Sequence, residues 1–277
     1  MHEISQDWVI VLGATSSFGS ATLRALAQSG FNVYGIFFGT ASQVELARAL
    51  SASLEGVPGV VRMVNANAVR PETRVEVIAD IRSVTPDARV KVLLHSLAFG
   101  SLGTFIHLAN PERVAEDDAE YSESEIGRLS EKQISMTMDV MATSMLTWTR
   151  DLYDDGLLAR GSQVWGMTSA GDTHAMDAYG AVSMAKAALA AIARQLAFEL
   201  AQDGVSINLI RAGVTRSPAL LKIPGHVAQT RKALAQNPSR RLTVGEDVAA
   251  VIAALAAVPE LWLNGDTISV DGGEIIV

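Results

Sequence analysis

Residues 8–21 have the sequence WVIVLGATSSFGSA, and this stretch decides the fold. Five apolar residues typical of a buried strand lead into a turn of small residues, after which a helical pattern continues to Gly30. Small residues let a backbone approach a dinucleotide pyrophosphate, and the positive end of the helix attracts its charge. Gly13 and Gly19 would carry this geometry, whereas Ser17 stands where the usual pattern has its middle glycine. A plain tight turn is the alternative for the motif by itself.

The rest of the chain repeats the alternation of short apolar runs with longer helical patterns. This alternation predicts an α/β fold of the Rossmann type, a doubly wound parallel sheet of about seven strands with helices on both faces. Because each run is almost continuously hydrophobic, we expect every strand to be covered on both faces. The clearest helix covers residues 180–201, and Gly204 should end it as a C-terminal glycine cap. The predicted strands are residues 8–12, 32–37, 60–64, 90–95, 163–167, 206–210 and 267–270.

Length and composition favour a single folded domain over residues 1–277. The chain is 49% hydrophobic and 19% charged, which argues against a disordered or fibrous protein. Residues 109–132 are rich in Asp and Glu, which predicts a solvated surface or, from its position, a flap over the site. Residues 218–240 follow a strand end where open α/β sheets bind ligands, so we expect a substrate-binding segment around residues 214–241.

Charge and residue types exclude several classes of partner. Acidic residues outnumber basic ones by 30 to 22, and a net charge of -8 gives no reason to expect nucleic acid or anionic lipid as a partner. The chain has no cysteine and its five histidines lack metal-ligand spacing, so no metal site is expected. The sequence shows neither the layout of a signal peptide nor an apolar stretch of about 18 residues, so we expect a cytoplasmic protein without a membrane span.

The end of the second predicted strand bears on the choice of cofactor. An NAD-specific site usually places an acidic side chain there for the adenosine ribose, but this chain has Phe37. Phe37 removes the repulsion that would exclude a 2′-phosphate, which favours NADPH over NADH, although no arginine adjoins it to pair with the phosphate. Asn67, with Ala68 beside it, follows the third strand and is a candidate for binding the adenine. As an Asn after a strand, it is equally a candidate turn residue.

Tyr179 and Lys186 are the candidate catalytic pair. They lie seven residues apart, and seven helical steps of about 100° fall only about 20° short of two turns, so both side chains should point the same way. A positive charge beside a phenol lowers the free energy of the developing phenolate, and the ammonium can also fix ribose hydroxyls of the cofactor. A tyrosine at the core edge and a solvated lysine are the alternative.

Ordered motifs along the chain resemble the short-chain dehydrogenase/reductase family. The spacing Tyr-x6-Lys is that of its divergent enoyl-acyl-carrier-protein reductase branch, whereas Val182 stands where ketone- and alcohol-reducing members with Tyr-x3-Lys have their tyrosine. Many enoyl reductases carry a second tyrosine ten residues before the catalytic one, and this chain has Ser169 there. The resembling segments are residues 13–19, 94–99, 138–144, 204–217, 223–225, 238–241 and 265–273.

The resemblance implies reduction of the 2,3 double bond of an enoyl thioester by NADPH or NADH, as in fatty-acid biosynthesis. The acyl group would be carried by acyl carrier protein or coenzyme A. Tyr179 would hydrogen-bond the enolate oxygen, Lys186 would hold the cofactor ribose, and Ser169 is a third catalytic candidate. The further cofactor contacts are Gly13, Ser16, Ser17, Phe18, Gly19, Phe37, Asn67, Ala68, Ser96, Leu97, Ala98, Thr168, Ala212, Gly213, Thr215 and Ser217.

Two other functions stay open. Residues 166–174 contain no bulky aromatic to wall a pocket, so the enzyme could reduce another carbonyl or conjugated substrate with Tyr179, or with Thr168 and Ser169. A cofactor-binding protein without turnover is the alternative from another class, because Val182 and Ser169 depart from the active patterns. The family also implies a homotetramer, formed through the helices of Asp139 and Lys186 and the C-terminal segment.

Overall fold

The computed structural model describes residues 5–108 and 126–276. These residues form a seven-stranded sheet in the order β3-β2-β1-β4-β5-β6-β7, and all its strand pairs are parallel. The strands are β1 (Asp7–Leu12), β2 (Asn32–Phe37), β3 (Val61–Asn65), β4 (Arg89–His95), β5 (Gln163–Thr168), β6 (Ser206–Ala212) and β7 (Thr267–Val270). The predicted fold class is confirmed, and each predicted strand lies within two residues of its expected bounds.

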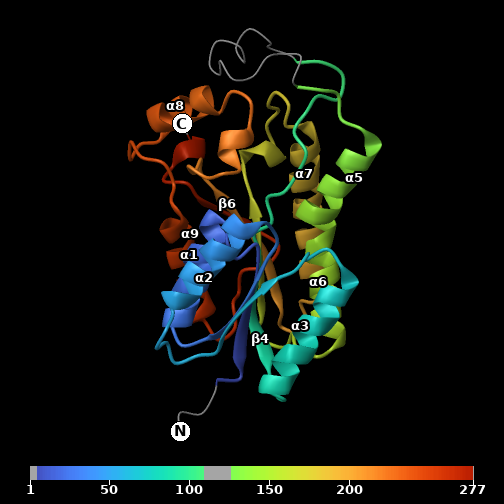
Figure 1. The fold of residues 1–277 in the computed structure, drawn as a ribbon, viewed down its shortest axis with the longest axis vertical. Helices are drawn as coiled ribbons and strands as arrows, with labels where there is room; N and C mark the ends of the chain where they lie inside the picture. The colour runs from blue at the N-terminus through green and yellow to red at the C-terminus, as the bar shows by residue number, and fades with distance from the viewer. Residues whose placement is uncertain (1–4, 109–125, 277) are drawn as a thin grey trace.

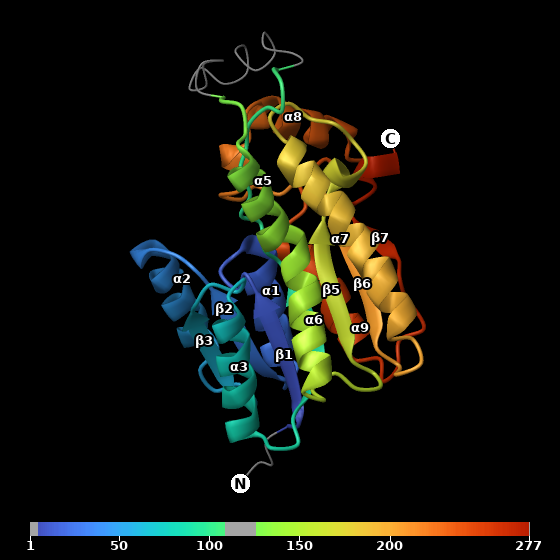
Figure 2. The same ribbon diagram turned by 90° about the vertical axis from the view of Figure 1, so that its right-hand side faces the viewer.

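Helices cover both faces of the sheet, as predicted (Figures 1 and 2). One layer contains α3 (Pro71–Val84), α5 (Glu131–Met138), α6 (Ser144–Asp154) and α7 (Gly180–Glu199), and a large apolar cluster fills the space beneath it. The other layer contains α1 (Ser17–Gln28), α2 (Ala41–Ala52) and α9 (Gly245–Ala256) over a second cluster. Figure 2 shows α5 and α6 as one continuous column beside α7. A π-helical segment, η1 (Asp139–Thr143), joins the two.

The strand order places the candidate site. β1 lies between β2 and β4, so the chain crosses from β1 in one direction and later returns to the other side of it. Ligands of open α/β sheets bind at such a switch point, beyond the carboxyl ends of the strands. These ends lie toward the top of Figure 1, where α8 (His226–Gln236) is also found.

The expectation that every strand is covered on both faces is wrong for β3 and β7. Both contain partly exposed residues along their length, whereas the other five strands are almost entirely buried. β3 and β7 are the two edges of the sheet, so each lacks a neighbour on one side. Their apolar residues are consistent with half-burial at an edge, which hydrophobicity alone does not distinguish from full burial.

The end of α7 also differs from the prediction. The helix ends at Glu199 with Leu200 as its C-cap, while Gly204 takes a left-handed φ of 72° in the turn that follows. By length and composition alone α7 could cross a membrane, with a mean hydropathy of 1.3. It packs instead against the β5–β6 side of the sheet, and a core helix passes the same test.

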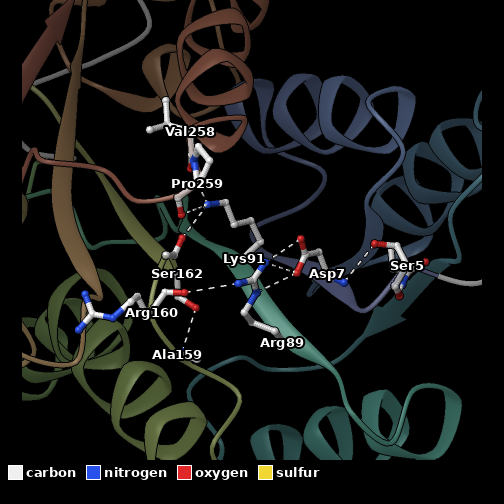
Figure 3. Close-up of polar contacts among 11 residues, drawn as sticks. Ser5, Asp7, Arg89, Lys91, Ala159, Arg160, Ser162, Val258 and Pro259 are labelled. Carbon is white, nitrogen blue, oxygen red and sulfur yellow. Dashed lines mark hydrogen bonds and ion pairs between the residues drawn. The ribbon is translucent and has the colours of Figure 1, made fainter.

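A buried lysine holds the opposite end of the sheet together (Figure 3). Lys91 on β4 donates hydrogen bonds to the carbonyls of Gly161 and Val258, both at 2.7 Å, and of Pro259 at 3.2 Å. Gly161 precedes β5, and the other two residues follow α9. One ammonium group therefore ties a central strand to two connecting loops.

Candidate active site

The turn after β1 has the geometry that a dinucleotide requires. Gly13 has a φ of 87°, and a Cβ atom there would collide with the carbonyl of Ser96 at the end of β4. A Cβ atom on Gly19 would collide with the Gly13 carbonyl. The Ser16 hydroxyl caps α1 by accepting from the Gly19 amide at 3.0 Å, and it lies 3.0 Å from the Ser96 hydroxyl. The glycine turn is therefore tight, begins a helix and faces the switch point, and it fits a pyrophosphate.

The three residues predicted to contact the adenosine half of the cofactor lie in different surroundings. Phe37 is buried and lines a surface hollow together with Arg48 of α2, a residue that sequence reasoning did not connect with it. Asn67 forms a turn, because its side-chain oxygen accepts from the Val69 amide at 3.0 Å. Ala68 is buried, and its carbonyl accepts from the indole of Trp148 at 2.7 Å. The turn interpretation of Asn67 thus has direct support.

Lys186 is buried beneath the ends of β4 and β5. Its ammonium donates to the Met167 carbonyl at 2.5 Å. Burial lowers the pKa of Lys186 to about 8, although the nearby Asp172 carboxylate partly opposes this. His95 is fully buried, and burial followed by the charge of Lys186 lowers the pKa of its imidazole to about 3. At neutral pH the lysine is mainly charged and the histidine is neutral.

Tyr179 does not lie on the helix but caps it. With φ −108° and ψ 4° it is the N-cap of α7, so the same-face argument applies only from Gly180 onward. Ala178 before it has a left-handed φ of 56°, an uncommon conformation for a residue other than glycine that is often found at functional sites. Burial raises the pKa of the Tyr179 phenol, and the Ser169 hydroxyl partly opposes this. The phenol therefore keeps its proton at neutral pH and can donate it.

The two hydroxyl residues at the end of β5 differ in their surroundings. Thr168 is buried and donates to the Asp172 carboxylate at 3.1 Å, so its hydroxyl is already engaged. The Ser169 hydroxyl is buried and, by distance and angle, forms no hydrogen bond within the described residues, although it lies close enough to the Tyr179 phenol to lower its pKa against the larger effect of burial. Of the two, Ser169 is the one whose hydroxyl can still bind a substrate oxygen beside Tyr179.

A partly buried ion pair adjoins these residues and was not predicted. Arg211 lies opposite Thr168 in the pairing of β5 with β6. Its Nη2 atom lies 3.0 and 3.2 Å from the two carboxylate oxygens of Asp172. The residues are 39 positions apart, and only the strand register brings them together.

Phe105 supplies the aromatic wall that residues 166–174 lack. Residues 166–174 contain no bulky aromatic residue around Tyr179, but a Cβ atom on Gly180 would collide with the Phe105 ring, so the two are in contact. The Gly103 amide donates to the Ala178 carbonyl at 2.8 Å and fixes this segment beside the tyrosine. Phe105 is 46% exposed and the neighbouring Ile106 66% exposed, so apolar surface borders the phenol.

The segment after β6 is ordered by its own hydrogen bonds. Thr215 donates to the Gly213 carbonyl at 3.2 Å, and the Ser217 hydroxyl accepts from the Leu220 amide at 3.2 Å. The Val214 amide donates to the Glu274 carboxylate at 3.1 Å, and burial raises the pKa of that carboxyl group. The predicted substrate-binding segment begins two residues after the buried Ala212 at the end of β6.

This segment also contains α8, which the weak periodicity did not predict as a helix. Gln229 of α8 contacts the sulfur of Met176 at 3.8 Å, so the helix reaches the loop before Tyr179. The acidic stretch lies mainly in residues 109–125, outside the described residues. Leu129, in the described end of this stretch, donates its amide to the Thr104 carbonyl at 2.9 Å.

The remaining predicted cofactor residues follow these elements. Ser17 and Phe18 open α1, while Leu97 and Ala98 follow Ser96 beyond β4. Within residues 5–108 and 126–276, no group of three His, Asp or Glu side chains could hold a metal ion.

Comparison with known proteins identifies the family. A sequence model of the family described as Enoyl-(Acyl carrier protein) reductase matches residues 13–274. The chain belongs to the short-chain dehydrogenase/reductase family. It is accordingly an NAD(P)-dependent oxidoreductase of this type.

The relatives within the family differ in the reaction that their names state. The chain is 26% identical to the 3-oxoacyl-[acyl-carrier-protein] reductase FabG of Salmonella typhimurium, over 97% of each chain. The enoyl-[acyl-carrier-protein] reductase (NADH) of Aquifex aeolicus has a TM-score of 0.77 at 19% identity, covering 98% of this chain and 97% of that one. An enoyl-(acyl-carrier-protein) reductase of Anaplasma phagocytophilum in complex with NAD has a TM-score of 0.74 at 17% identity, covering 100% and 96%. The structural likenesses show the fold, and the substrate has to be argued from the site.

Proposed function

We propose that this short-chain reductase reduces the 2,3 double bond of an enoyl thioester. The observation that carries the proposal is the position of the acid. Val182, four residues before Lys186, is buried and has no proton to donate, whereas Tyr179 is a protonated phenol in front of the helix. Phe105 beside Gly180 adds an apolar wall suited to an acyl chain.

The chain has residues that fit a nicotinamide dinucleotide. The glycine turn at Gly13 and Gly19 would hold the pyrophosphate at the N-terminus of α1. Lys186 would bind ribose hydroxyls, and Ser96 lies at the switch point beside the turn. We favour NADPH over NADH because no acidic residue occurs from Phe37 to the start of α2, where a carboxylate would repel a 2′-phosphate.

The spacing of Tyr179 suits a thioester better than a ketone. The six helical steps from Gly180 to Lys186 correspond to about 9 Å along the axis, and Tyr179 lies beyond them as the N-cap, whereas a spacing of four residues corresponds to about 6 Å. When bound, the reduced nicotinamide supplies the hydride that enters the β-carbon of the substrate. Negative charge then collects on the thioester oxygen, three bonds away from that carbon, and Tyr179 donates its hydrogen bond there. A proton from solvent at the α-carbon completes the two-electron reduction.

Reduction of a 3-oxoacyl thioester is the second candidate function. It is favoured by the Ser169 hydroxyl, which is buried and lies beside the Tyr179 phenol, whose pKa it lowers against the larger effect of burial. Such a hydroxyl could bind a ketone oxygen, and the FabG relative is named for this reaction.

The deciding experiment follows the absorbance of the reduced nicotinamide with the purified protein. NADPH and NADH are each tested with a short 2-enoyl thioester and with the matching 3-oxoacyl thioester. We expect oxidation with the enoyl substrate alone and a lower KM for NADPH. Oxidation with the 3-oxoacyl substrate alone would replace the proposal by the second candidate. If neither substrate reacts while the cofactor binds, both candidate reactions are rejected.

Tyr179→Phe tests the role of the acid. Loss of the phenol should lower kcat by roughly 100-fold or more, while cofactor affinity stays unchanged because Lys186 and the glycine turn remain. Tyr153→Phe is the matched control, since Tyr153 is a surface tyrosine that donates to Asp203. Equal rates for Tyr179→Phe and the native protein would remove Tyr179 from the mechanism.

The proposal includes a cytoplasmic role in fatty-acid biosynthesis and a homotetramer. Exposed aromatic side chains support an assembly, since Trp262 before β7 is 99% exposed and Phe198 on α7 is 81% exposed. Multi-angle light scattering of the purified protein measures its mass in solution and so tests the proposed homotetramer.

A further inference from the structure

Asp172 forms a partly buried ion pair next to the proposed catalytic lysine. Its side chain is only 4% exposed, and that of its partner Arg211 is 20% exposed. The carboxylate accepts from Arg211 at 3.0 Å and from the Thr168 hydroxyl at 3.1 Å. The pair therefore connects a short 3-10 turn, η2 (Ala170–Asp172), to the ends of β5 and β6.

Lys186 is held at the same strand end. Its ammonium donates to the carbonyl of Met167, the residue directly before Thr168. The α7 helix that carries Lys186 also packs against η2, which carries Asp172. The ion pair and the lysine are thus linked through one peptide of β5.

The charges around Lys186 come from a few elements. Among the described residues, Asp172 of η2 is the group that raises its pKa, against the larger effect of burial. His95 at the end of β4 is uncharged, because burial and Lys186 lower its pKa to about 3. Tyr179, whose pKa is raised by burial, is also uncharged at neutral pH. Arg211 on β6 is the cation beyond Asp172, and its Nε atom is buried without an acceptor among the described residues.

We propose that Asp172 and Arg211 are positioning residues that act through Lys186, with Asp172 keeping its ammonium charged and Arg211 limiting that effect. The inference rests on the proposed role of Lys186 in holding the cofactor, but not on the identity of the substrate. Because a carboxylate favours a neighbouring cation and a guanidinium disfavours it, the two residues act on the lysine in opposite directions.

The direction in which the pKa of Lys186 shifts depends on the charge that remains after each substitution. Asp172→Asn removes the stabilising anion and leaves Arg211 uncompensated, so Lys186 loses its proton at lower pH. Arg211→Gln leaves the carboxylate without a competing cation, so Lys186 keeps its proton to higher pH. We expect shifts of about one pH unit from the gain or loss of a single nearby charge. The double variant restores a neutral pair and should return close to the native value.

The test measures NADPH affinity from the change in nicotinamide fluorescence between pH 6 and 9.5. Affinity of the native protein should fall as pH rises through about 8, where burial places the pKa of Lys186. We expect the midpoint to move down in Asp172→Asn, up in Arg211→Gln and back in the double variant. Lys186→Met should bind weakly at every pH without this transition.

Several outcomes would overturn the proposal. These are shifts of the same sign in both single variants, no shift in either, or a transition that persists in Lys186→Met. Asp172→Glu, which keeps the charge, should retain the native midpoint and separates electrostatics from a folding defect. Because no substrate is present, signed shifts without enoyl thioester reduction would reject the proposed function and leave this inference standing.

Discussion

Single residues at the carboxyl end of the sheet are driven toward their uncharged forms by burial. Burial lowers the pKa values of Lys186 and His95 and raises that of Tyr179. Asp172 opposes this trend for the lysine alone. The site therefore has one retained cation beside a neutral acid, which is the arrangement that a phenol needs to donate a hydrogen bond to a developing anion.

Gly13 is a position in the cofactor turn that has no room for a side chain. In Gly13→Ala the Cβ atom would meet the Ser96 carbonyl, and the left-handed φ of 87° adds backbone strain. We expect a loss of roughly 2–4 kcal/mol in the free energy of unfolding and a loss of cofactor binding, measured by urea denaturation and NADPH titration.

Gly30→Ala is the matched control for this prediction. Gly30 has a φ of 91°, but nothing lies within 4 Å of its Cβ position. It should therefore show only the backbone effect, about 1–2 kcal/mol, with native cofactor affinity. Equal effects of the two substitutions on cofactor affinity would show that crowding at Ser96 does not shape the turn.

The sequence revealed those site residues whose role is local. Gly13 and Gly19 follow from a strand-turn-helix pattern, and Tyr179 and Lys186 from their spacing. Asp172 was seen only as part of a segment, because its pairing with Arg211 depends on the register of β5 and β6. Side-chain contacts across 39 positions leave no periodic signal in a single sequence.

Among the elements, the helix of Asp139 contains a feature that periodicity did not reveal. The π-helical segment η1 interrupts the column of α5 and α6 beside α7. Just after it, the Ser144 hydroxyl donates to the Val140 carbonyl at 2.8 Å. The same oxygen can then only accept from Nε2 of His95, at 2.7 Å. His95 thus fixes the wider helical turn against the end of β4.

Ser144→Ala tests this attachment. The variant removes the hydroxyl that binds Nε2 of His95, while Nδ1 has no side-chain or backbone partner by distance and angle among the described residues. Burial keeps the imidazole from protonating, so the polar atoms stay unsatisfied, and the free energy of unfolding should fall by about 1–3 kcal/mol. Thermal denaturation measures this loss of stability, and Ser135→Ala on the exposed face of α5 is the control. Equal melting temperatures would contradict a role for the His95 contact.

The elements were predictable to different degrees for physical reasons. Buried central strands such as β2 are nearly uniform apolar runs, so their bounds were found. The edge strands β3 and β7 have similar composition but different exposure, because exposure depends on sheet order. Helix α8 was missed because only Ala233 is buried on it, which leaves almost no apolar stripe in its sequence.

In the whole molecule, the two ends of the sheet have different tasks. The carboxyl end contains the glycine turn, Lys186 and Tyr179. The opposite end contains Lys91, whose three carbonyl partners lie in the loops before β5 and after α9 (Figure 3). Burial, followed by the charge of Arg89, lowers the pKa of Lys91, while the Asp7 carboxylate and the carbonyl dipoles favour its charged form. This end of the molecule should contribute to stability without contributing to chemistry.

Lys91→Met tests this division. Methionine fills a similar volume but leaves the carbonyls of Gly161, Val258 and Pro259 without their donor. Unsatisfied buried carbonyls should lower the free energy of unfolding by about 2–4 kcal/mol, measured by urea denaturation. The kcat of the folded variant should stay within about twofold of the native value, because no site residue moves.

Arg160→Gln is the control in the same region, since Arg160 is 61% exposed, pairs with the exposed Glu260 and donates a further hydrogen bond to the exposed Gln202. Exposed ion pairs contribute about 0–1 kcal/mol, so its stability should hardly change. If Lys91→Met were as stable as Arg160→Gln, the ammonium would not hold the loops. If it lost activity while remaining folded, the two ends of the sheet would be coupled.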